Sequence, residues 1–143
     1  MAQTARRGID LSWLVTLRWG ALAGQLATIV AVDRLMGIAL PLVPLAAILA
    51  IGVASNVALA AWRRRAAVED AMLAAVLLLD VGLLTAVLYF TGGPFDPFSF
   101  LYLVNVALAA VILPAGWTWA LAGASSALFG ALFFAHVPLP LGD

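Results

Sequence analysis

Residues 70–90 read DAMLAAVLLLDVGLLTAVLYF, an apolar run that begins at Asp70 and has a second carboxylate, Asp80, near its centre. A helix needs about 20 apolar residues to cross a hydrocarbon core about 30 Å thick. This stretch has that length, with three arginines before it at residues 63–65 and a group of glycines and prolines after it. It therefore predicts a helix that spans a membrane.

The composition indicates that lipid is the solvent for the whole chain. Of its 143 residues, 66% are hydrophobic and only 10% are charged, whereas a soluble domain carries about 25% charged residues. Five segments have the length and hydropathy of a spanning helix, and the fourth is the shortest. We therefore expect an all-α fold, a single polytopic transmembrane helix bundle over residues 1–143, with spans at about 11–32, 42–62, 70–90, 98–113 and 117–135.

The polar residues exclude several classes of function. All seven basic residues are arginines in scattered small sets, so no basic stripe is available to bind nucleic acid. The chain has no cysteine, which excludes disulfides and thiol chemistry. With one histidine, His136, and no carboxylate cluster, we expect no metal site and no catalytic residue in this segment. His136 itself is interpreted as a solvated residue at the membrane interface.

The arginines also predict the orientation. Arg6 and Arg7 precede the first span, and residues 63–65 follow the second. Cytoplasmic loops carry the positive excess, and clustered arginines at that surface can bind anionic lipid head groups. We therefore expect a cytoplasmic N-terminus, with the connection between the third and fourth spans on the outside.

That outer connection reads TGGPFDPF at residues 91–98. Its glycines permit close backbone approach, its prolines stiffen the chain, and its rings present flat apolar faces. One interpretation is a notch for a flat amphiphile that arrives from the bilayer. The other is a tight turn whose rings belong to the interfacial aromatic belt. The first interpretation assigns to the notch Gly92, Gly93, Pro94, Phe95, Asp96, Pro97, Phe98 and, two turns into the next span, Asn105.

A second set of polar residues lies inside the spans. Asp80 sits where a charge costs at least about 2.5–3.5 kcal/mol, and Arg18 lies at nearly the same depth in the first span. We expect these two to form an ion pair, with Gln25 on the same face of the first span. This polar seam is interpreted as a structural pair that fixes helix register, as a relay below the outer loop, or as part of a transport path.

Two stretches resemble a known family. GGPFDPF at residues 92–98 is similar to the G-G-x-x-N-P-F motif of the RegB/PrrB/ActS-type redox-sensing histidine kinases, and LRWGALAGQ at residues 17–25 is similar to a pattern in their first span. The resemblance implies that the outer loop, together with Asn105, binds ubiquinone or ubiquinol taken from the bilayer. It also implies a six-span sensor domain in the bacterial inner membrane.

The resemblance implies further parts and partners. In this family a cytoplasmic kinase core follows the last span, phosphorylates itself with ATP, acts on a cognate response regulator and works as a homodimer. The sequence has five apolar segments and no kinase-core motif. We therefore expect it to be the sensor part of such a kinase, one span short and not an enzyme by itself.

One residue departs from the family motif, since Asp96 stands where the family has asparagine. An asparagine amide donates to a quinone carbonyl, whereas an ionised carboxylate only accepts and would favour the quinol. A protonated Asp96 could still donate. The expected function is a quinone-sensing input domain of a two-component kinase. The alternatives are a small transporter or channel that uses Asp80 and Arg18, and a membrane anchor without a ligand.

Overall fold

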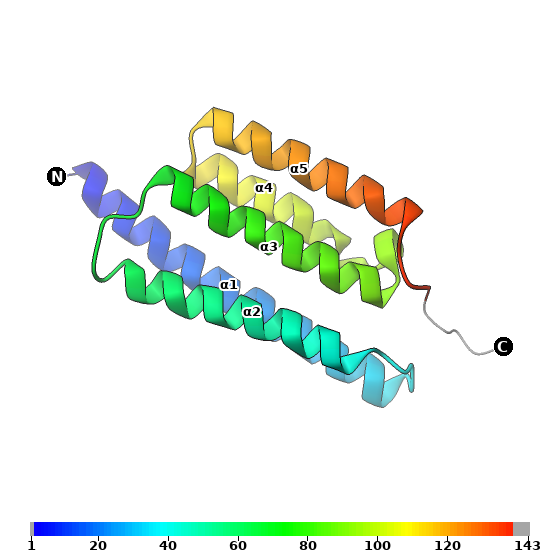
Figure 1. Cartoon of the computed structure of the whole chain (residues 1–143). Coiled ribbons are helices and arrows are strands. Elements are labelled where there is room, and N and C mark those ends of the chain that lie inside the picture. The colour runs from blue at the N-terminus through cyan, green and yellow to red at the C-terminus, as the bar shows by residue number, and fades with distance from the viewer. Residues whose placement is uncertain (1, 139–143) are drawn as a thin grey trace.

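The chain folds as an up-and-down helix bundle in the computed structural model, which describes residues 2–138 and the side chains of residues 11–138 (Figure 1). The predicted all-α class is confirmed. Within the described residues the elements are α1 (Ala2–Leu35), α2 (Leu42–Trp62), α3 (Asp70–Thr91), the short 3-10 helices η1 (Gly93–Phe95) and η2 (Pro97–Phe100), α4 (Leu101–Ile112) and α5 (Ala115–Phe134).

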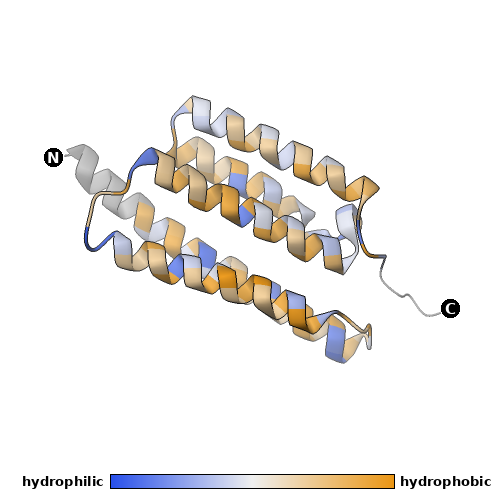
Figure 2. Ribbon diagram, in the orientation of Figure 1, coloured by the Kyte–Doolittle hydropathy of each residue, from blue (hydrophilic) through white to orange (hydrophobic). Residues whose placement is uncertain are grey.

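Four of these helices, α1, α2, α3 and α5, are long and apolar enough to cross a membrane. Large apolar side chains such as Trp13, Val43, Val111 and Phe134 are exposed on the outside of the bundle. Hydrophobic residues make up most of the helical ribbon in Figure 2. A surface of this kind suits lipid and not water, so the chain is a membrane protein.

The fourth predicted span, 98–113, corresponds to the apolar helical segment Pro97–Ile112, whose first turn is the 3-10 helix η2. Asp96 and Pro97 start the 3-10 turn η2, so α4 begins only at Leu101. At the other end Pro114 forces Leu113 into an extended conformation, with φ −115° and ψ 154°. Together the four residues of η2 and the 12 residues of α4 extend about 26 Å, a few ångströms short of a hydrocarbon core of about 30 Å. The candidate span within α1, Leu11–Leu35, begins where expected and ends three residues later, and α5 starts at Ala115, two residues before the expected 117.

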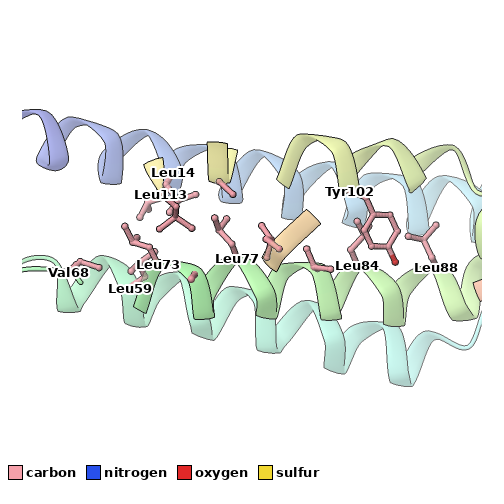
Figure 3. Close-up of a cluster of buried hydrophobic side chains, with 14 of the residues drawn as sticks. Leu14, Leu59, Val68, Leu73, Leu77, Leu84, Leu88, Tyr102 and Leu113 are labelled. Atoms are coloured by element: carbon pink, nitrogen blue, oxygen red, sulfur yellow. The ribbon is translucent and has the colours of Figure 1, made fainter. Parts of the chain in front are cut away.

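The third helix is the centre of the bundle. It packs against α2 on one side and against α4 and α5 on the other, whereas α1 packs mainly against α2. Leu77, Val81 and Leu88 of α3 are fully buried. Figure 3 shows the core around them, where Leu14 of α1 and Tyr102 of α4 meet the face of α3.

The two ends of the bundle carry different connections (Figure 1). We call one end the loop end: it holds the connection 36–41 between α1 and α2, and the turns η1 and η2. The opposite, arginine end holds the start of α1 and the connection 63–69. A second small core at the loop end comprises Ile29, Leu40, Leu45 and Val87. There the Val137 N–H also donates to the Tyr89 carbonyl at 2.8 Å, which ties the segment after α5 to α3.

Leu77→Ala and Leu78→Ala test this packing on neighbouring residues, because Leu77 is fully buried and Leu78 is 48% exposed. A buried Leu→Ala change costs about 2–5 kcal/mol in soluble cores, and we expect a loss near the lower end of that range for Leu77→Ala, since lipid also solvates leucine. Leu78→Ala should change the free energy of unfolding little. Thermal unfolding in nanodiscs measures both, and equal losses would contradict the central position of α3.

Candidate functional site

Two glycines turn the chain after α3. Gly92 ends the helix with φ 117°, and Gly93 follows with φ 69°, a region that other residues enter only with strain. A Cβ added to Gly93 would lie 2.5 Å from the ring of His136. The structure thus places His136 directly against this turn, half-buried, with Nδ1 2.9 Å from the Leu132 carbonyl oxygen.

Asp96 holds the next turn of the loop. Its Oδ1 accepts a hydrogen bond from the Phe98 backbone N–H at 2.8 Å, which caps η2. Its Oδ2 accepts from the Thr91 hydroxyl at 2.5 Å. Both carboxylate oxygens are therefore engaged within the loop, so the side chain expected to contact a ligand also fixes the shape of its own turn.

The other half of the loop faces α5. Pro94 is buried, whereas Phe95 is 80% exposed and meets the edge of Phe133 with 6.2 Å between ring centroids. Gly92, Gly93, Pro94 and Phe95 lie outside the cavity described next. They shape the turn, and of the predicted loop set only Asp96, Pro97 and Phe98 line that cavity.

A cavity of about 260 Å³ opens beside the loop, and we call it the loop cavity. Its walls come from the loop, the end of α3, the connection 36–41 and the second half of α1. The walls are mostly apolar, including Ile29, Val32 and Val87. Its polar side chains are Gln25, Thr28, Thr91 and Asp96. This is an apolar pocket with a few polar groups, the usual form of a small-molecule site.

A second cavity of about 340 Å³, the inner cavity, lies between α1, α3 and α4. Arg18, Asp80, Gln25 and Asn105 all line it. Asn105, predicted as part of the loop site, therefore belongs to this cavity. The reason is its height, since it lies seven residues after Phe98, about 10 Å further along the helical segment. Gln25 lines both cavities.

The structure brings Arg18 and Asp80 together in a bidentate ion pair. Arg18 Nε is 2.8 Å from Asp80 Oδ2, and Nη2 is 2.6 Å from Oδ1. The same guanidinium donates to Ser55 Oγ at 2.7 Å and to Asn56 Oδ1 at 3.3 Å. Arg18 is only 6% exposed. The network therefore joins α1, α2 and α3 inside the membrane-spanning part.

Comparison with known proteins finds a similar sensor histidine kinase. RegB of Cereibacter sphaeroides is 33% identical to the chain over 134 residues, which are 93% of this chain and 29% of RegB. This similarity supports a RegB-type sensor domain. No protein-family model matches the chain, and no solved structure matches it. The chain spans about 29% of the length of the RegB that it matches, and it forms a helical membrane domain.

Both stretches that resemble RegB-family patterns reach the loop cavity. Residues 92–98 contribute Asp96, Pro97 and Phe98. Residues 17–25 contribute Gln25 to the loop cavity and Arg18 to the inner cavity. Segments about 70 positions apart in the sequence are thus brought together on the two sides of one cavity.

Ser55 and Asn56 were missed by the sequence reasoning. Asn56 is fully buried, and its amide donates to the Val15 carbonyl at 3.2 Å. The signal was available, because a Ser-Asn pair in the middle of an apolar span requires partners from another helix. Tyr102, whose hydroxyl lies 2.6 Å from that of Thr85, carries the same kind of signal.

Removing either residue of the Arg18–Asp80 ion pair should destabilise the bundle, but the two losses should differ in size. Removing one partner of a buried pair costs about 3–5 kcal/mol. Asp80→Leu should cost more than Arg18→Met, because an unpaired carboxylate can take up a proton whereas arginine stays charged. The double variant should recover most of the loss. Thermal unfolding in nanodiscs tests this, and a double variant as unstable as the sum of the singles would contradict a direct pair.

Asp96→Asn should keep the loop intact, whereas Asp96→Ala should not. The asparagine oxygen can still cap Phe98, and its amide can donate to the Thr91 hydroxyl. Loss of the cap in Asp96→Ala should cost about 0.5–2 kcal/mol. Hydrogen exchange of the amides of residues 97–100 measures the local effect. Equal exchange in the alanine and asparagine variants would show that capping does not hold this turn.

Proposed function

We propose that this chain is the quinone-sensing input domain of a RegB-family sensor histidine kinase, which signals the redox state of the ubiquinone pool. The observation that carries the proposal is the loop cavity, because both family-like stretches line it. The proposed setting is the bacterial inner membrane, with a cytoplasmic N-terminus and the loop end outside. The arginines at 63–65 then lie at the cytoplasmic surface.

The residues of the loop cavity fit a quinone head group. Its volume of about 260 Å³ is just below the range of about 300–1,000 Å³ for small-molecule pockets, which suits one substituted ring and not a whole lipid. Apolar side chains such as Ile29 and Val87 would contact the ring, and Phe98 offers an aromatic face. Few polar groups converge there, as a ligand with two oxygens on an apolar ring requires.

A ligand acts as a signal only through its different affinity for two states of the protein. A tenfold difference between oxidised and reduced quinone supplies about 1.4 kcal/mol, enough for a graded shift between two packings of the bundle. In the proposed full kinase, a further span would pass this shift to an ATP-dependent kinase core. A homodimer and a cognate response regulator complete the proposed two-component system.

Ubiquinone binding in nanodiscs, titrated separately with oxidised and reduced ligand, tests the proposal. Thr28→Trp should fill the loop cavity and weaken binding by at least about tenfold, which corresponds to about 1.4 kcal/mol. Ala27→Trp is the matched control, because Ala27 is exposed on the same helix and does not line the cavity. Binding that is not saturable in the wild type, or is equally weakened by both variants, would contradict the site.

A further inference from the structure

We infer that Gln25, and not Asp96, donates the hydrogen bond that holds oxidised quinone in the loop cavity, and that Gln25 thereby sets the redox preference. The inference rests on the proposed function. It follows from the hydrogen bonds already present among the four polar side chains that line this cavity.

Three of these four side chains are already engaged. The Thr28 hydroxyl donates to the Gly24 carbonyl at 3.0 Å. The Thr91 hydroxyl has a single proton, which lies within reach of Asp96 Oδ2 and of the Val87 carbonyl. Asp96 accepts through both oxygens, and an ionised carboxylate has no proton to donate. None of the three therefore has an N–H or O–H left for a ligand.

Gln25 differs from all three. Its amide makes no side-chain hydrogen bond within the described part of the chain, although it lies in a helix that spans the membrane. An unpaired amide is costly at that depth because lipid offers no partner. Gln25 therefore has two N–H donors and a carbonyl acceptor available at the wall of the loop cavity.

The two redox forms of the ligand need opposite partners. Quinone oxygens only accept hydrogen bonds, so oxidised ligand requires a donor, and Gln25 is the side chain that has one free. Quinol hydroxyls donate, and they find acceptors in Asp96, in the threonine oxygens and in the Gln25 carbonyl. Loss of the Gln25 amide should therefore weaken oxidised ligand selectively.

The test compares the wild type with Gln25→Met, which keeps side-chain length and removes the amide. Oxidised ubiquinone should bind the variant about five- to tenfold more weakly, the equivalent of one hydrogen bond of about 1–1.4 kcal/mol. Reduced ligand should change by less than about twofold, since other acceptors remain. Leu26→Met is the matched control, because Leu26 is exposed on the same helix and lines neither cavity. It should leave both affinities unchanged.

Infrared spectroscopy of bound oxidised ubiquinone gives a second readout that a merely structural role would not move. One carbonyl stretch should lie below its value in lipid and return to the lipid value in Gln25→Met. In wild-type protein with nitrogen-15-labelled glutamine, the side-chain amide proton of Gln25 should shift downfield in the NMR spectrum when oxidised ubiquinone binds. This shift of the labelled amide decides the question even if Gln25→Met does not fold.

The possible results of these experiments distinguish this inference from the proposed quinone-sensing function on which it rests. Absence of saturable binding to the wild type overturns both. Saturable binding that Thr28→Trp blocks, with Gln25→Met unchanged and no label shift, overturns the role of Gln25 alone.

Discussion

A charged arginine inside a bilayer must have its hydrogen-bond donors satisfied by the protein, because lipid offers neither water nor counter-ions. Arg18 meets this condition with partners from two other helices, Asp80 of α3 and the Ser55–Asn56 pair of α2. The requirement fixes the positions of α1, α2 and α3 relative to one another, since a shift of any one helix would leave a charged group without its partner. The engagement of both Asp80 oxygens favours a structural role for the pair over a transport path.

The loop cavity lies closer to the loop end of the bundle than this network, and α1 contributes residues to both. Gln25 lines both cavities and lies two turns along α1 from Arg18. In the proposed sensor, a ligand that engages Gln25 would bear on the same helix that Arg18 locks to α2 and α3. Besides this network, α1 contacts mainly α2 and makes few contacts with α4.

Much of this architecture could be predicted from sequence, because a helix that crosses lipid must be apolar over the length of the crossing. The length of each apolar run therefore indicates the length of its helix. The ranges expected for α2 and α3 agree closely with the structure, and equal depth in two spans was enough to suggest that Arg18 and Asp80 meet. It was harder to infer which cavity or surface each side chain of a helix or loop would face. Asn105 lines the inner cavity because it lies about two turns further along the helix than Phe98, and Phe95 of the turn η1 faces outward. The contact of His136 with Gly93 depends on how the chain returns after α5, which no local pattern encodes.

The shortness of α4 has a mechanical consequence. With η2 the segment Pro97–Ile112 extends about 26 Å, a few ångströms less than a hydrocarbon core of about 30 Å. A bilayer that thins beside α4 to match this length pays fractions of a kcal/mol per ångström of mismatch. Acyl-chain length would therefore act on α4, a helix that lines the inner cavity.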